Sequence, residues 1–181
     1  LLQHAEERRQ QLHGRAAILA GSCSVRTLEQ IRNYLQRHPG IAVDPDSVLD
    51  RRMSPDDIVR FANRHSDDTV IAYSSANPAD VAAVQQRRGA SLVAHALERF
   101  FSDTAQALIA SGVRRLIVAG GETSGAVVSA LGFDALDIGP EISPGVPVLY
   151  AGAMVLALKS GNFGDADFFE RALRLMEQED S

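Results

Sequence analysis

The sequence contains no tryptophan, a single cysteine and a single lysine among its 181 residues. The lone Cys23 cannot form an internal disulfide and excludes a zinc site built from several cysteines, so it is typical of a reducing compartment such as the cytoplasm. No apolar run approaches the roughly 18 residues that a membrane-spanning helix needs. With 18 basic and 23 acidic residues the net charge is −5, which argues against a nucleic-acid partner bound by bulk positive charge.

The composition that remains is that of an ordinary globular protein. Apolar residues make up 45% of the chain and charged residues 23%, close to average usage. A length of 181 residues predicts one domain rather than several. The sequence begins with Leu1 and Leu2 instead of an initiator methionine, so we expect it to be part of a longer protein. Residues 1–12 are charged and predict a helix or a linker.

Short apolar runs alternate with amphipathic stretches along the chain. Strands are expected at residues 15–20, 41–43, 47–49, 69–73, 114–119, 135–138, 146–150 and 154–158. Helices are expected at residues 24–38, 54–64, 78–87, 90–111, 126–131 and 166–177, with a polar loop at 74–78. Apolar strands that alternate with helices favour an α/β fold, which we predict to be a three-layer αβα arrangement with a largely parallel central sheet.

Three loops rich in small residues follow predicted strands, at residues 21–24, 120–125 and 159–164. Ligands of α/β sheets bind beyond the carboxyl ends of the strands. Small residues let backbone N–H groups approach a phosphate, and a following helix adds the positive end of its dipole. Any one such loop can simply connect a strand to a helix, but three together favour phosphate binding. The candidate ligand-binding residues are Ser22, Ser24, Gly120, Gly121, Glu122, Thr123, Lys159, Ser160, Gly161 and Asn162.

Two of these candidates carry charge and have alternative interpretations. Glu122 would repel a phosphate, so it either holds a metal ion or a ribose hydroxyl, or it complements the helix dipole as an acid of the first turn. Lys159, the only ammonium group of a side chain, suits a phosphate but is equally compatible with a surface lysine. Asn162 and Ser160 either donate to the same oxygens or form a turn.

Several other chemistries are disfavoured. The sequence contains neither a P-loop nor the G-x-G-x-x-G fingerprint of dinucleotide-binding proteins. No two histidines have metal-ligand spacing, so no metal site made by protein ligands is predicted. Residues 121–125 resemble the nucleophile elbow of α/β hydrolases, but Thr123 stands in the place of the nucleophile and no histidine follows it. Cys23 lies near a predicted helix N-terminus, yet no histidine is near it in sequence to activate it.

The motifs in these loops have a characteristic order. They are AGGETSG at 119–125, IGPEI at 138–142, PGVP at 144–147 and ALKSGNFG at 157–164, preceded by GSCS at 21–24 with Thr27 and Gln30. This pattern resembles the nucleotide-binding C-terminal domain of the four-carbon acid sugar kinase family, over residues 18–173. Among members of that family, those that phosphorylate 3-oxo-tetronates are the most similar.

The resemblance implies a two-domain kinase of which this chain, residues 1–181, is the single nucleotide-binding domain. It implies that ATP and Mg²⁺ are the cofactors, with ATP contacts at Ser22 or Ser24, at 120–123 and at the turn of Ser160 and Gly161. The sugar acid and the catalytic residues would belong to an N-terminal domain absent from this sequence. We therefore predict the ATP-binding part of a kinase that transfers the γ-phosphate to a hydroxyl of a four-carbon sugar acid. A non-catalytic nucleotide sensor is the alternative, no nucleic-acid or membrane partner is expected, and a homo-oligomer is left open.

Overall fold

The computed structural model describes residues 14–74 and 78–177. The helix or linker expected at 1–12 and most of the polar loop expected at 74–78 lie outside these residues. The strands are β1 (Arg15–Ala20), β2 (Gly40–Ala42), β3 (Val70–Tyr73), β4 (Val113–Ala119), β5 (Asp137–Ser143), β6 (Val146–Ala151) and β7 (Met154–Lys159). The helices are α2 (Val25–Tyr34), α3 (Pro45–Leu49), α4 (Pro55–Arg64), α5 (Pro78–Arg88), α6 (Ala90–Ala110), α7 (Gly121–Leu131) and α8 (Phe168–Leu175).

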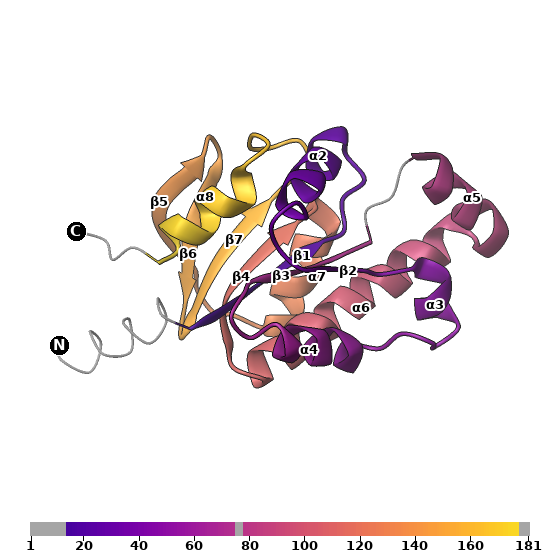
Figure 1. The fold of residues 1–181 in the computed structure, drawn as a ribbon, viewed down its shortest axis with the longest axis horizontal. Coiled ribbons are helices and arrows are strands. Elements are labelled where there is room, and N and C mark those ends of the chain that lie inside the picture. The colour runs from indigo at the N-terminus through magenta and orange to yellow at the C-terminus, as the bar shows by residue number, and fades with distance from the viewer. Residues whose placement is uncertain (1–13, 75–77, 178–181) are drawn as a thin grey trace.

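The strands form one seven-stranded sheet in the order β2-β3-β1-β4-β7-β6-β5 (Figure 1). The first five strands in this order, from β2 to β7, are parallel to one another. Strands β6 and β5 extend the sheet beside β7 as an antiparallel hairpin. The central strands are buried on both faces, which explains why their sequences are continuous apolar runs. The prediction of a largely parallel sheet is therefore confirmed.

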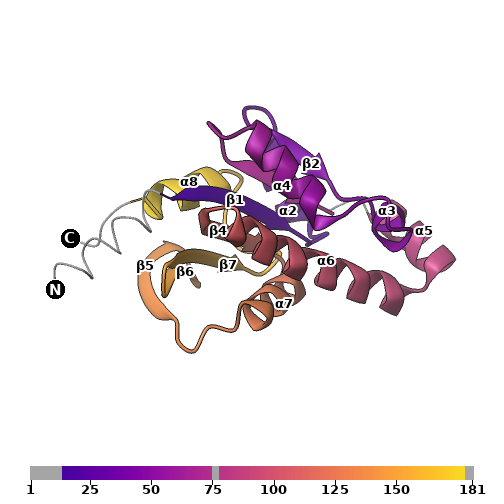
Figure 2. The ribbon, with the colours of Figure 1, turned by 90° about the horizontal axis from the view of Figure 1, so that it is seen from below.

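Helices cover both faces of the sheet and complete the three layers (Figure 2). In β1, Ala17 and Leu19 belong to the core beneath α4, α6 and α7, whereas Ile18 and Ala20 belong to the core beneath α2 and α8. This alternation follows from the two-residue period of a strand. Within the described residues, no helix is both long and apolar enough to cross a membrane.

The connections diverge at the boundary between β1 and β4. After β1 the chain passes through α2 to β2 and β3 on one side of the sheet order, and after β4 it passes through α7 to the hairpin on the other side. Loops that leave neighbouring strands in opposite directions leave a crevice at the carboxyl edge, where α/β proteins bind ligands. The first two of the three predicted loops flank this crevice.

Three predicted elements differ in the structure. The strand predicted at 135–138 is found as β5 at Asp137–Ser143, so it continues through Gly139 and Pro140. Residues 47–49 lie in helix α3 and not in a strand, because Asp44 caps this helix by accepting a hydrogen bond from the Ser47 N–H at 2.9 Å, and Pro45 occupies its first position. Helix α7 begins at Gly121 instead of residue 126, so most of the predicted loop at 120–125 is helical. By contrast, the expected start of α4 is confirmed by a capping box between Ser54 and Asp57.

Candidate functional site

Backbone hydrogen bonds tie the three predicted loops to one another at the carboxyl edge of the sheet. The N–H of Gly21 donates to the carbonyl of Ala119 at 2.9 Å, and the N–H of Gly120 donates to the carbonyl of Lys159 at 2.8 Å. These bonds continue the pairing of β1 with β4 and of β4 with β7 beyond the strands. The structure therefore brings together three segments that are far apart in sequence, as the sequence predicted.

Glycine is required where these loops touch. A Cβ atom on Gly21 would collide with the side chain of Thr123, and one on Gly161 would collide with the hydroxyl of Ser22. Gly120 has a φ of 126°, and a Cβ there would lie 3.2 Å from the backbone nitrogen of Ser22. Side chains at these positions would force the loops apart, so the small residues serve close approach of backbone to backbone.

The first turn of α7 presents backbone donors. Gly120 is the N-cap and provides no side-chain cap, and the hydrogen bond from the Ser124 N–H to the Gly120 carbonyl closes the first turn at 2.8 Å. The N–H groups of Gly121, Glu122 and Thr123 therefore have no acceptor within the helix. A Cβ built on Gly121 meets no heavy atom within 4 Å, so this turn opens onto free space. Such a helix N-terminus favours an anion.

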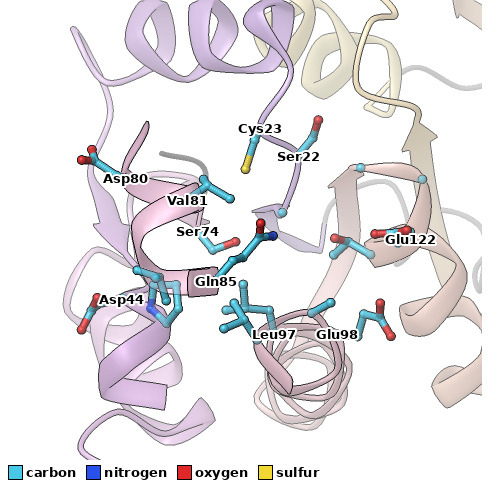
Figure 3. Close-up of a pocket in the computed structure, with 18 residues that line it drawn as sticks. Ser22, Cys23, Asp44, Ser74, Asp80, Val81, Gln85, Leu97, Glu98 and Glu122 are labelled. Carbon is cyan, nitrogen blue, oxygen red and sulfur yellow. The ribbon is translucent and has the colours of Figure 1, made fainter. Parts of the chain in front are cut away.

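The free space beside this turn is a cavity of about 540 Å³ (Figure 3). One side is formed by residues 21–23 and 120–123, and the other by side chains of α3, α5 and α6. The described residues that line it include no lysine, arginine or histidine, and four of them are acids, namely Asp44, Asp80, Glu98 and Glu122. The cavity thus combines neutral backbone donors at one end with acids around it.

The predicted site residues divide into two groups. Those that line the cavity are Ser22, Gly120, Gly121, Glu122 and Thr123. Those that lie outside its lining are Ser24, Lys159, Ser160, Gly161 and Asn162. The second group includes two residues that connect the third loop to α2, since the hydroxyl of Ser24 donates to the carbonyl of Gly161 at 2.5 Å.

A row of polar side chains on α2 binds the segment that follows β7. Thr27 and Gln30 are fully buried, and with Asn33 they recur at every third position, on one face of the helix. All three donate to backbone carbonyls of residues 161–166. The pairs are Thr27 Oγ1 to Gly161 O at 2.9 Å, Gln30 Nε2 to Phe163 O at 3.0 Å and Asp165 O at 2.8 Å, and Asn33 Nδ2 to Ala166 O at 2.9 Å.

Lys159 is the last residue of β7, and its side chain is 1% exposed. Its ammonium group donates to Thr27 Oγ1 at 2.9 Å and to the carbonyls of Ser160 and Gly161 at 3.1 Å each. Burial lowers the pKa of Lys159 to about 8. The surface-lysine interpretation is therefore wrong, and the ammonium group lies beneath the third loop, outside the lining of the cavity.

The carboxylates do not form a ready-made metal site. Within residues 14–74 and 78–177, no group of three or more His, Cys, Asp or Glu side chains could hold a metal ion. Glu98 and Glu122 line the same end of the cavity, from α6 and from the first turn of α7 (Figure 3). One or two carboxylates suffice for Mg²⁺ when phosphates and water supply its other ligands.

Sequence reasoning missed the wall of the cavity opposite the loops. This wall includes Ser74, which follows β3, and Gln85 on α5, together with valines of α5 and α6. Ser74 follows a predicted strand just as the three loops do, and that position was a usable signal. The valines gave none, because aliphatic residues on a helix are ordinarily part of the core.

Comparison with known proteins finds a matching family and several similar kinases. Residues 17–169 match a family described as the nucleotide-binding C-terminal domain. The chain is 46% identical over 172 residues to a 3-oxo-tetronate kinase of Methylobacterium radiotolerans, covering 90% of this chain and 40% of that protein. It is 42% identical over 167 residues to a 3-oxo-tetronate kinase of Pectobacterium atrosepticum, covering 88% of this chain and 39% of that protein.

A crystal structure of a Haemophilus influenzae protein has the same fold. Its TM-score is 0.86 and its identity 36%, and the match covers 90% of this chain and 40% of that one. The chain thus spans about two fifths of the length of the relatives that it matches.

Proposed function

We propose that this chain, which belongs to the nucleotide-binding C-terminal domain family of four-carbon acid sugar kinases, binds ATP. The γ-phosphate of that ATP is transferred to a hydroxyl of a sugar acid such as 3-oxo-tetronate. The observation that carries the proposal is the first turn of α7. Its first three N–H groups, which have no acceptor within the helix, lie at a cavity whose edge is built from tightly packed glycine loops.

The backbone of this turn suits the phosphates of ATP. Phosphoryl transfer needs positioning and charge stabilisation more than covalent participation by the protein. The N–H groups of Gly121, Glu122 and Thr123 provide fixed donors, and the helix dipole adds positive potential at the same point. Mg²⁺ bound with the nucleotide would neutralise part of the phosphate charge, and Glu98 and Glu122 are the lining carboxylates that would hold it.

The acceptor requires groups beyond this cavity. A sugar acid carries a carboxylate, and the described lining offers that carboxylate four acids and no cationic side chain. We therefore assign recognition of the acceptor, and the base that activates its hydroxyl, to the part of the longer relatives that this chain does not cover. The chain alone is expected to bind ATP without phosphorylating tetronates, which calorimetry and a coupled assay of ADP release would check. Turnover by these 181 residues would contradict the assignment.

The phosphate site is tested by Gly121→Val. The positive φ belongs to Gly120 and not to Gly121, and a Cβ on Gly121 points into open space, so valine should leave the melting temperature nearly unchanged. Its methyl groups should occupy the position of the phosphates and weaken ATP binding about 100-fold or more, by calorimetry with ATP and Mg²⁺.

The matched control is His95→Ala, because His95 is exposed on α6 and does not line the cavity. This variant should bind ATP like the parent. If Gly121→Val bound ATP as tightly as the parent with a normal melting curve, α7 would not hold the phosphates.

A further inference from the structure

We propose that the cavity between α5 and α6 is a nucleobase subsite, in which the heteroaromatic ring of the nucleotide lies against both helices while its phosphates lie at the first turn of α7. This inference rests on the proposed function, because it assigns the other end of the same ligand. It identifies residues that none of the three loops contains.

The two helices form an apolar wall. Val81 and Val84 of α5 and Val93 and Leu97 of α6 line the cavity, and Val93 is 4% exposed (Figure 3). Pro45 of α3 extends the same wall. Ligand pockets for small molecules are lined mainly by apolar side chains with a few polar groups that fix orientation. A flat ring that buries its faces against aliphatic side chains fits this lining.

Two polar side chains project from this wall. The hydroxyl of Ser74 is buried, with the residue 7% exposed, and it has no hydrogen-bond partner in the described structure. The Gln85 amide reaches into the middle of the cavity, on the side toward which the Ser74 oxygen points (Figure 3). A hydroxyl and an amide can both donate and accept, which matches the ring nitrogens and exocyclic groups at the edge of a base. A bound base would supply the partner that Ser74 lacks.

Charge fixes the direction in which the nucleotide lies. Because the described lining residues include acids and no cation, a phosphate placed between α5 and α6 would be repelled, whereas an uncharged ring would not. Asp44 is already engaged as the N-cap of α3 through Ser47. The donors of α7 lie at the opposite side of the cavity, so base and phosphates occupy separate ends.

The exposed ring of Phe163 is the rival position for a base. Phe163 is 43% exposed and lies in the third loop, with its ring over Gly145. It is absent from the lining of the cavity. The Gln30 Oε1 atom is also buried and unpaired, and the Gln30 amide donates to the Phe163 carbonyl, but Gln30 is fully buried and does not line the cavity. The unpaired hydroxyl of Ser74 does belong to the cavity lining, so the cavity is the better site.

The test compares ATP with inorganic tripolyphosphate, which has the phosphates but no base. Calorimetry in the presence of Mg²⁺ would measure both ligands on the parent and on three variants, Ala94→Leu, Ser74→Ala and Phe163→Ala. Ala94 lines the cavity on α6, and leucine there fills the cavity while suiting a helix. We expect the parent to bind ATP more tightly than tripolyphosphate. Ala94→Leu should weaken ATP binding about ten-fold or more and Ser74→Ala about five-fold, with tripolyphosphate affinity unchanged.

The remaining outcomes separate this inference from the proposed function. Two outcomes would place the base elsewhere: Phe163→Ala weakens binding of ATP but not of tripolyphosphate, or Ala94→Leu binds ATP as tightly as the parent. Either outcome would refute the subsite and leave the proposal of ATP binding intact. Equal affinity of the parent for ATP and tripolyphosphate would also refute it. If the parent bound neither ligand, the proposed function would fail, and the subsite with it.

Discussion

Two regions near the cavity, here called flanks, are held in place by different forces, and only the second contributes residues to the cavity lining. The carbonyl-bonded flank consists of α2 and residues 159–166, where buried Thr27, Gln30 and Lys159 donate to backbone carbonyls. The ion-paired flank consists of α3 and α5, where Arg87 and Arg88 form salt bridges with Asp46 at 2.7 and 2.8 Å. The first supports the loops proposed to hold phosphates, and the second supports the wall proposed to hold the base.

This difference predicts how each flank responds to change. Removing a donor from a buried carbonyl leaves that group unpaired, which costs about 1–3 kcal/mol. Exposed ion pairs contribute much less and are screened by salt. The structure of the carbonyl-bonded flank should therefore be strongly destabilised by mutation and hardly affected by salt. The structure of the ion-paired flank should be little affected by single mutations and weakened by salt.

The largest effect is expected from Gln30→Leu. Its amide donates to two carbonyls, those of Phe163 and Asp165, and the residue is fully buried. Leucine removes both donors, so the free energy of unfolding should fall by roughly 2–4 kcal/mol. Urea denaturation followed by circular dichroism would measure the loss. Gln36→Leu, at an exposed position just beyond the same helix, should change the value by less than about 0.5 kcal/mol. Similar losses in the two variants would contradict the special role of Gln30.

Lys159→Met should change the dependence of stability on pH. Burial lowers the pKa of Lys159 to about 8, below the 10.5 expected in the unfolded chain. Between these two values the unfolded chain binds a proton that the folded chain does not, so this group makes stability rise with pH across that window. The rise should be on the order of 2–3 kcal/mol in the parent and absent in Lys159→Met. Denaturation at about pH 7.5 and about pH 10.5 would compare the two proteins. Parallel pH profiles would show that folding does not lower the pKa of Lys159.

The effect of His38→Gln should be smaller and opposite in sign. The ring nitrogens of His38 lie 2.7 Å from Asp68 and 2.7 Å from Glu170, which ties the segment after α2 to α8. Burial lowers the pKa of His38, but hydrogen bonds to both carboxylates outweigh this and raise it above 6.5. The resulting stabilisation is complete below pH 6.5 and is lost as pH rises through the raised pKa. Melting curves across that range should differ between parent and variant only at the acidic end.

Asp46→Asn should have the smallest effect on stability and should reveal the ion-paired flank through salt. Asp46 lies between Arg87 and Arg88, and both hold its pKa below the usual value by hydrogen bonding. Raising NaCl from roughly 50 mM to roughly 500 mM screens the phosphates of both ATP and tripolyphosphate. In the parent, the affinity for ATP should fall by more than the affinity for tripolyphosphate, because only ATP uses the wall that the salt bridges support. In the variant this difference should shrink, because among the described residues of this flank only the pair of Arg88 with Asp50 at 3.0 Å remains. An unchanged difference in Asp46→Asn would show that the salt bridges of Asp46 do not support the wall.

Much of the fold was predictable because its strands are buried on both faces. Apolar runs such as 15–20 identified the central strands, and the cap at Ser54 identified the start of α4. Residues 47–49 were assigned to a strand because three residues carry little periodicity, although Asp44 and Pro45 are the same kind of start signal as Ser54 and Pro55. Glycines at 121 and 125 concealed the first turns of α7, where contacts with other elements outweigh helix propensity.

The site was predictable in part, for a similar reason. Loops after strands are marked in sequence by small residues, so the convergence of the three loops could be anticipated. The burial of Lys159 could not, because its partner Thr27 is 132 positions away. The wall of α5 and α6 was missed as well, because the apolar spacing of Val81 or Leu97 does not distinguish a residue that lines a cavity from one that fills a core.

The way in which α2 recognises residues 161–166 has a consequence for how this protein can evolve. Thr27, Gln30 and Asn33 read carbonyl groups, which every amino acid carries, and not the side chains of that segment. Drift at Asn162 or Ala166 therefore leaves the shape of the loop intact, while the helix that holds it has little freedom to vary. Mutational tolerance is thus distributed unevenly between two segments in direct contact. The third loop can acquire new side chains at Asn162 without losing its geometry, whereas Gly161 must remain glycine.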